Sequence, residues 1–560
     1  METKIISRIG YKDIFNKQIN LNDLISKIEL EPALEFLVAL NKFEYKIHEE
    51  GISELKFICN DWLHDSSLSF KKEIINHYSQ FLQVNKKHRN IVVDLQSVKI
   101  INKVATLRVI EILLANGNSN SGGNSDPEDL FKLYLVINDE LAERESYFFK
   151  KWLPQQDKKE NEIRLHLYLG INQMILNDES LNKKIWVEAL KFAQFEKWIK
   201  NQDKYNHLTI DYLNQFEAND WYELFTIIFE INTVGLNHYK FSNAENSKNL
   251  KLLSYFSDHI EKNTNWNELS EIRKKPLYKQ KNGDFLILDF AFLLEKFFSG
   301  IYHDIINFSN EKNLQRFHQD YSLTFVEGYL LVNSLKAVFG NSYIQFDEKK
   351  IKSIGIKGID NLALPDYYIR NGNKVFLFEC KNSLISNRSK LSINCDEIEI
   401  ELKDKFYVSG TKKKAVKQLI NFIELSQNGK YKSFDKNSKL ENCIYYPILI
   451  TTDITLTSLA FNEILNEYLN KDLVSSKNEF SKRIKPLTII HINDLLLRTS
   501  RLKKLDQFID DYSKYCKSNK GVDGMISFSD YLDRIKFLND RYIDHKSFKK
   551  MLSGSILPEK

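Results

Sequence analysis

Cysteine, proline and glycine are all scarce in this sequence, which has Cys 5, Pro 8 and Gly 19 among 560 residues. So little glycine and proline argues against a fibrous repeat or a long disordered chain. The cysteines are odd in number and scattered, and no C-x-x-C pair occurs, which excludes a recognisable zinc ribbon. We therefore expect free thiols in a reducing compartment, and so a cytoplasmic protein.

Long apolar runs and familiar cofactor motifs are also missing. No stretch of eighteen apolar residues occurs, so no membrane span and no membrane partner are expected. The opening residues, METKIISRIGYKDIF, lack the apolar core of a signal peptide. No glycine-rich phosphate loop opens a helix, and no Ser/His/Asp or Cys/His arrangement stands out. His238, His303 and His318 form no ligand pair at helical spacing, so we interpret them as structural or surface residues.

What the chain does contain is typical of a globular protein of two to four domains. Hydrophobic residues make up 42% and charged residues 28% of the sequence. The net charge of +5 is mild for this length, and it permits nucleic-acid binding without requiring it.

The pattern predicts an N-terminal α/β module over residues 1–175, mainly helical up to residue 89. Apolar and β-branched runs then predict strands at 90–98, 130–137 and 162–170, separated by helices at 102–115 and 140–152. The polar segment NGNSNSGGNSD, residues 116–126, is expected to be a flexible loop. Residues 176–310 predict a helical region whose many aromatic side chains form core rather than a base-stacking surface.

The most informative stretch is LPDYYIRNGNKVFLFECKN, from Leu364 to Asn382. The Asn-Gly turn between two β-prone runs predicts a hairpin with strands at 367–370 and 375–381. Alternation along the second strand places Glu379 and Lys381 on one face and the Cys380 side chain on the other. Asp366, at the start of the first strand, is expected to join Glu379 and Lys381.

Two carboxylates that converge from neighbouring strands repel each other unless a cation lies between them. Hard oxygen ligands of this kind suit Mg²⁺, for which Mn²⁺ can substitute. A lysine beside such a metal can orient a water molecule, help to deprotonate it, or stabilise charge that develops on a phosphate.

Pro365-Asp366 followed after a hairpin by Glu379-Cys380-Lys381 resembles the signature of the PD-(D/E)XK nuclease superfamily. The resemblance implies a restriction-endonuclease-like core with a mixed sheet at residues 311–500. The polar, helical pattern of residues 501–560 predicts a C-terminal extension that packs on this core. The resemblance also implies that Asp366, Glu379 and the Cys380 backbone carbonyl bind the metal, and that Lys381 is catalytic.

Flanking segments follow the element order of that superfamily. A predicted helix at 317–339 carries Glu327 on a mostly apolar face, where a carboxylate could complete the metal site or form a buried ion pair. A second predicted helix at 412–425 carries Gln418, which matches part of a Q-x-x-x-Y motif, with Phe422 in place of the tyrosine. Strands are then predicted at 445–451 and 487–492.

Four lysines at the start of that second helix are candidates for phosphate contacts: Lys412, Lys413, Lys414 and Lys417. An ordinary solvated helix end is an equally good interpretation of them. By resemblance we expect a Mg²⁺-dependent endonuclease, acting on DNA in anti-phage defence or restriction, with a homodimer or a partner defence protein left open. The alternatives are a catalytically silent nucleic-acid-binding or scaffold protein of nuclease fold, and a ligand-gated sensor-effector nuclease.

Overall fold

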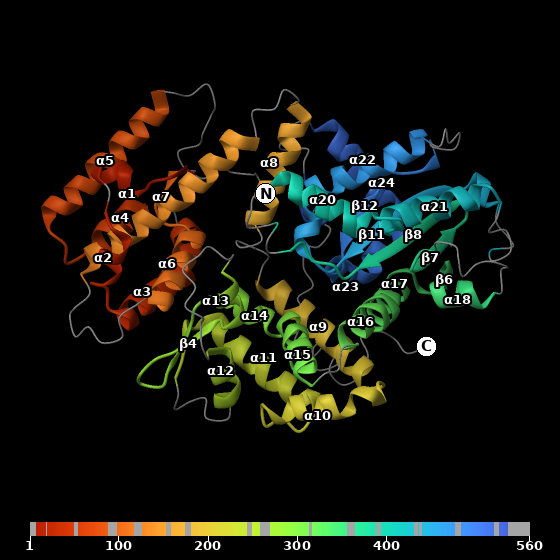
Figure 1. Cartoon of the computed structure of the whole chain (residues 1–560), viewed down its shortest axis with the longest axis horizontal. Helices are drawn as coiled ribbons and strands as arrows, with labels where there is room; N and C mark the ends of the chain where they lie inside the picture. The colour runs from red at the N-terminus through yellow and green to blue at the C-terminus, as the bar shows by residue number, and fades with distance from the viewer. Residues whose placement is uncertain are drawn as a thin grey trace.

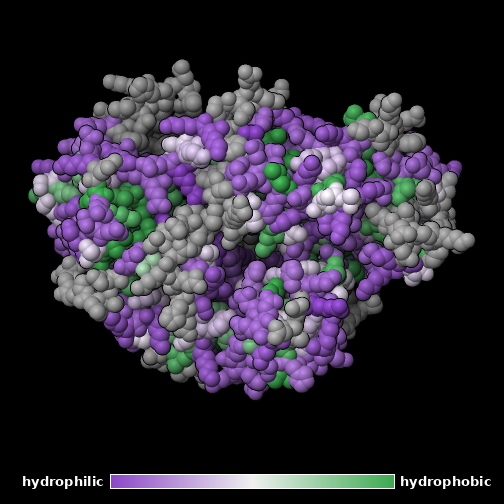
Figure 2. All heavy atoms as spheres, in the orientation of Figure 1, coloured by the Kyte–Doolittle hydropathy of each residue, from purple (hydrophilic) through white to green (hydrophobic). Residues whose placement is uncertain are grey.

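The computed structural model describes most of the chain: residues 7–17, 19–49, 54–87, 98–116, 126–152, 158–173, 181–242, 249–257, 269–312, 316–354, 364–386, 389, 394–429, 435, 439–475, 483–519 and 526–535. The protein is mixed α/β, and Figure 1 shows helical regions at the left and bottom and a sheet covered by helices at the right. Within these residues no helix is both long and apolar enough to cross a membrane. Hydrophilic side chains cover most of the face seen in Figure 2.

The N-terminal region is built from helices around one apolar core. Its elements are β1 (Ser7–Arg8), α1 (Tyr11–Phe15), α2 (Leu21–Ile25), α3 (Leu30–Glu49), α4 (Glu54–Phe57), the π-helical η1 (Ile58–Trp62), α5 (Leu68–Lys87), β2 (Val98–Lys99), α6 (Lys103–Asn116), α7 (Pro127–Trp152) and α8 (Lys158–Gln173). Strands β1 and β2 form a two-residue parallel pair. The predicted helix at 102–115 is confirmed by α6.

Two strands predicted for the N-terminal α/β module are wrong, because their residues lie in α7 and α8. The run at 130–137 looks like a buried strand because α7 is covered on several sides, so that Leu133, Tyr134 and Leu135 are all buried. In α8 the alternating sequence is misleading, since Ile163 and Leu167 fall four residues apart on one buried face. Most of the strand predicted at 90–98 and most of the loop predicted at 116–126 lie outside the described residues.

The middle region is helical, as predicted, with a three-stranded sheet that was not predicted. Its elements are α9 (Leu181–Lys200), η3 (Asp203–Tyr205), α10 (Asn206–Asn214), α11 (Trp221–Asn237), β3 (Lys240–Phe241), α12 (Leu250–Ser257), α13 (Ser270–Lys274), β4 (Leu277–Lys279), β5 (Phe285–Ile287), α14 (Phe290–Glu295) and α15 (Ser299–Glu311). Trp198, Trp221 and Phe225 belong to one buried cluster, which confirms that these aromatic residues form core.

The C-terminal region holds a five-stranded mixed sheet of order β12-β11-β8-β7-β6. Its strands are β6 (Ile344–Asp347), β7 (Tyr367–Asn371), β8 (Lys374–Lys381), β11 (Ile444–Thr451) and β12 (Thr488–His491). Strands β8, β11 and β12 run parallel, and β7 and β6 pair antiparallel to their neighbours. The predicted hairpin is confirmed, with Gly372 at φ 59° in its turn, a conformation that favours glycine.

Helices cover both faces of this sheet (Figure 1). The described elements around it are α16 (Phe317–Asp320), the π-helical η5 (Tyr321–Leu331), α17 (Val332–Phe339), η6 (Gly340–Ser342), α18 (Glu348–Ser353), α20 (Cys395–Phe406), β9 (Val408–Ser409), β10 (Lys412–Lys413), α21 (Ala415–Gln427), η8 (Leu440–Asn442), η9 (Ile454–Thr457), α22 (Leu459–Ser475), α23 (Ile492–Arg498), η11 (Thr499–Lys504), α24 (Leu505–Ser518) and α25 (Phe528–Arg534). The alternation predicted for β8 is confirmed: Val375 and Leu377 pack with α20, α21 and α22, whereas Phe376, Phe378 and Cys380 pack on the opposite side.

The turn of the hairpin is anchored by a buried ion pair that the sequence did not indicate. The Arg370 Nε and Nη2 atoms donate to the two carboxylate oxygens of Asp435 over 2.5 and 2.8 Å. The Tyr368 hydroxyl also donates to Asp435, over 2.9 Å. Asp435 thus holds the hairpin against the connection that precedes β11.

Candidate active site

The hairpin brings Asp366, Glu379 and Lys381 together at the end of β8. Tyr367 pairs with Phe378, so Asp366 lies beside Glu379 on the adjacent strand. The Asp366 carboxylate accepts a hydrogen bond of 2.7 Å from the backbone N–H of Cys380. The Lys381 ammonium lies 2.8 Å from the Glu379 carboxylate. The predicted convergence of these three side chains is therefore present.

The Glu379 side chain is almost fully buried, and only one of its two carboxylate oxygens has a partner among the described residues. The side chain is 1% exposed, and Oε1 pairs with Lys381. The second oxygen, Oε2, has no hydrogen-bond partner within the part of the chain that the structure describes. A buried carboxylate oxygen without a donor costs free energy, so binding of either a proton or a cation at this position would be stabilising.

The electrostatics of the site follow from three carboxylates that surround one ammonium. Burial and the charge of Asp366 raise the pKa of Glu379 to about 8. The same two causes raise the pKa of Glu327 to about 8, and burial raises the pKa of Asp366 above its usual range. Although burial disfavours its charged form, the carboxylates of Glu379, Asp366 and Glu327 raise the pKa of Lys381. The carboxylates therefore favour the protonated form of Lys381.

Glu327 reaches this cluster from a helix with unusual geometry. The helix predicted at 317–339 is present as α16, η5 and α17, and its central eleven residues, Tyr321–Leu331, are π-helical. A π-helical segment is rare and occurs often at functional sites, because it re-aims the side chains of one turn. The amphipathic pattern predicted the helix, but it carried no signal for the change in winding.

Glu348 is an acidic neighbour that the sequence analysis missed. It is the first residue of α18, and its backbone N–H donates to the Asp366 carbonyl over 3.2 Å. Its charge raises the pKa of both Asp366 and Glu327. The carboxylate also pairs with Lys352 at 2.7 Å. The signal that could have located it is the Asp-Glu pair at the helix start, where Asp347 caps the Lys350 N–H over 2.7 Å.

The carboxylates of this site are of the type that binds a hard divalent cation, but their spacing does not form a ready-made binding site. Asp366, Glu379 and Glu327 offer carboxylate oxygens of the type that Mg²⁺ prefers, and Glu379 Oε2 lacks a donor. In the described ranges, however, no three His, Cys, Asp or Glu side chains already stand close enough together to hold an ion. The Lys381 ammonium instead compensates the Glu379 charge. The role of the Cys380 carbonyl stays a prediction.

The Cys380 thiol is excluded from the chemistry of this site. It is 0% exposed and packs among Phe376 and Phe378 on the other face of the sheet. Burial raises the pKa of this thiol well above its usual range, so the nucleophilic thiolate is disfavoured.

The lysine segment differs in shape from its prediction. Lys412 and Lys413 form strand β10, which pairs with β9, and the helix begins at Ala415 rather than at Lys412. The backbone of Lys414 is extended and caps α21, which explains the later start. Lys412 and Lys413 are exposed, as phosphate contacts require.

Two further residues of α21 were predicted to act at the site. The Lys417 ammonium is held by Asp472 of α22 at 2.7 Å and is only 28% exposed. This contact favours a structural role for Lys417 over binding to a nucleic acid. Gln418 is half-buried on the same helix, and its catalytic role stays a prediction.

Comparisons with protein-family models, with curated proteins and with solved structures find no match to this chain. The case for a function therefore depends on the residues themselves and on the geometry described above.

Proposed function

We propose that this protein is a metal-dependent nuclease that hydrolyses phosphodiester bonds, with DNA as the substrate to test first. The observation that carries the proposal is Oε2 of buried Glu379, which has no hydrogen-bond partner among the described residues and lies beside Asp366 and Lys381 at the end of a central strand. The order of helix, hairpin, helix and strand around these residues supports it, because that order is the one the PD-(D/E)XK resemblance implies.

In this proposal Asp366, Glu379 and Glu327 would hold Mg²⁺, which would supply stabilisation of negative charge on the phosphate. In the metal-free site the carboxylates of Glu379, Asp366 and Glu327 raise the pKa of Lys381, which favours its protonated form. Orienting the attacking water and stabilising developing charge are the two roles that suit a protonated amine.

The test is cleavage of plasmid, linear single-stranded DNA and RNA by the full chain, with Mg²⁺, Mn²⁺ or EDTA. Lys381→Ala and Glu379→Gln are the site variants. Glu143→Gln is the matched control, since Glu143 is 68% exposed on α7. We expect metal-dependent cleavage by wild type and control, and a loss of at least about 100-fold in both site variants.

Cleavage that survives both site substitutions would refute this site. A folded wild-type protein that binds nucleic acid but cuts none of the three substrates would favour the silent binding protein instead. The Lys381–Glu379 ion pair favours that alternative, because it gives one carboxylate a partner without a metal.

A further inference from the structure

A cavity of about 530 Å³ lies between the middle region and the carboxyl ends of the parallel strands. Thr451 pairs with both Lys381 and His491, so β8, β11 and β12 end in one row. Asn382 and Thr452, which directly follow β8 and β11, line the cavity. In open α/β sheets this edge is where ligands bind, and the volume is in the range of small-molecule sites.

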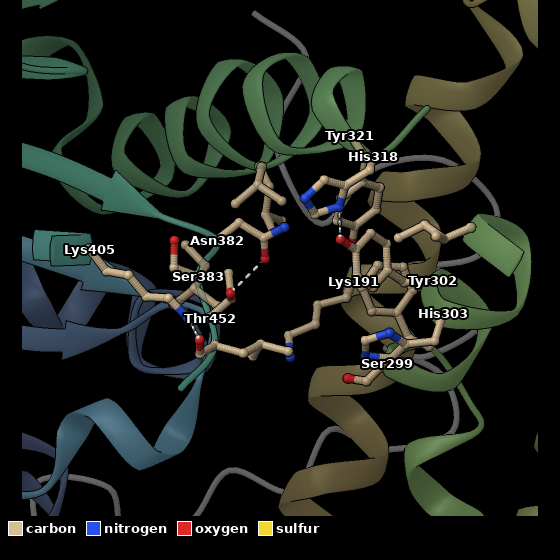
Figure 3. A pocket seen from close by; sticks show the side chains of 16 residues that line it. Lys191, Ser299, Tyr302, His303, His318, Tyr321, Asn382, Ser383, Lys405 and Thr452 are labelled. Carbon is tan, nitrogen blue, oxygen red and sulfur yellow. Dashed lines mark hydrogen bonds between the residues drawn. The ribbon is translucent and has the colours of Figure 1, made fainter. Parts of the chain in front are cut away.

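Lys191 of α9 supplies a buried positive charge to this cavity (Figure 3). The residue is 7% exposed, and its ammonium lies 3.0 Å from Glu188 Oε1. The other oxygen of Glu188 accepts hydrogen bonds of 3.0 and 2.9 Å from the backbone N–H and the hydroxyl of Ser299. Glu188 thus fixes the ammonium in place. An ammonium has three donors, and Glu188 is the one partner of Lys191 among the described residues, which leaves two donors for a ligand.

The remaining polar lining is basic or neutral. Lys405, His303 and His318 contribute to the wall, and no Asp or Glu is found among the described residues that line the cavity. The Lys405 ammonium pairs with Glu401, which does not line the cavity, and donates to the Leu384 carbonyl. Burial lowers the pKa of His303. His491, behind the strand ends, stays neutral, because burial and the charge of Lys191 lower its pKa to about 3. Its Nε2 lies 3.1 Å from the Thr452 carbonyl. The carboxylates that pair with Lys191 and Lys405 do not line the cavity, so the charged groups that face it are hydrogen-bond donors, which favours an anion.

The rest of the wall is aromatic and apolar. Figure 3 shows Tyr302 and Tyr321 side by side at the end of the cavity away from Lys405, and their ring centroids are 4.1 Å apart. The Tyr302 hydroxyl lies 2.6 Å from His318 Nδ1, which holds the ring in place. Val326 and Leu330 of η5 extend this apolar surface. A flat aromatic group would find stacking and apolar contacts here.

We propose that this cavity binds a nucleoside phosphate, with the phosphate at Lys191 and Lys405 and the base against Tyr302. The ligand is either a free mononucleotide or the terminal nucleotide of a strand, since the two present the same chemistry. A ligand bound in the cavity would lie next to the candidate active site, because Asn382, which lines the cavity, directly follows Lys381. Asn382 bridges Ser322 and Thr452 by hydrogen bonds of 3.0 and 2.7 Å. The proposal does not depend on nuclease activity, since it concerns binding alone.

The test is isothermal titration calorimetry of the full chain in EDTA, which prevents metal-dependent cleavage. The probes are AMP, inorganic phosphate, adenosine and a 5′-phosphorylated hexanucleotide. We expect AMP or the hexanucleotide to bind at least tenfold more tightly than either phosphate or adenosine. AMP binding points to a free nucleotide, and binding of the hexanucleotide alone points to a strand end; both support the site.

Lys191→Met, Lys405→Met and Tyr302→Leu should each weaken that binding at least tenfold. Lys514→Met removes a lysine of α24 that is 75% exposed and does not line the cavity, so it should change nothing. Lys191→Met leaves Glu188 without its ion-pair partner, so thermal denaturation checks its folding, and the other two variants decide if it fails. No binding of any probe, or binding that all three cavity variants retain, would overturn the proposal.

Discussion

The buried carboxylates predict that the protein loses stability as the pH rises through the neutral range when no divalent cation is present. Glu379 has a pKa of about 8 in the folded protein, against 4.5 for a free side chain. Between these values the folded state keeps a proton that the unfolded state has released. The unfolding free energy therefore falls as the pH rises.

The magnitude follows from one retained proton, which corresponds to about 1.4 kcal/mol per pH unit. From pH 5.5 to pH 7.5 Glu379 alone should thus contribute a loss of about 2.7 kcal/mol of unfolding free energy in wild type, to which Glu327, with a pKa of about 8, adds. Glu379→Gln removes the titrating group. Glu327, whose pKa is raised by burial and by the charge of Asp366, still titrates in this variant, so the variant should lose about 2.7 kcal/mol less than wild type over this range. The loss in wild type should be complete above pH 8 and absent below pH 4.5.

The measurement is urea denaturation at several pH values in EDTA, followed by the fluorescence of the 6 tryptophans. Glu143→Gln, which alters an exposed carboxylate of α7, serves as the control and should keep the wild-type slope. Equal slopes for wild type and Glu379→Gln would refute the argument, because Glu379 would then not hold the extra proton.

Further predictions concern the hairpin and the lysine segment. Asp435→Ala should cost about 3–5 kcal/mol in denaturant unfolding, because it leaves a buried guanidinium without its partner; a cost near zero would contradict this. Gly372→Ala should cost about 1 kcal/mol in the same assay, because the turn needs positive φ; an unchanged midpoint would count against the turn geometry. Replacing Lys412 and Lys413 by Gln should weaken DNA binding and lower the slope of log affinity against log salt by up to about 2, whereas Lys417→Met should leave that slope unchanged. The reverse pattern would show that Lys417 contacts phosphate.

Local patterns predicted the part of the site that lies on one hairpin. Asn371-Gly372 set the turn, and strict alternation placed Glu379 and Lys381 on the face opposite Cys380. Those features depend on residues close in sequence, so a period of two and a turn signal were sufficient. The aromatic core of the middle region was predicted for a similar reason, since large apolar side chains are usually buried.

In the N-terminal region the same kind of reasoning gave a wrong prediction, because the residues are buried on several sides. In α7 the run at 130–137 is apolar on nearly all sides, so neither a helical nor a strand period is visible. Only the neighbouring helices α1, α2 and α6 show which structure it adopts. The strand wrongly predicted at 130–137 followed from that, whereas the one predicted at 162–170 followed from the alternating sequence of α8.

By itself, the sequence determined the hairpin, the strands β11 and β12, the helical character of most segments, and which side chains share a face of β8. Only the tertiary structure decided what those faces meet: the unpartnered oxygen of Glu379, the approach of Glu327 and Glu348, and the cavity in which Lys191 lies beside residues that follow β8 and β11. Local geometry is set by neighbours within a few residues, whereas pKa shifts, ion pairs and cavities depend on groups far apart in the chain that packing brings together.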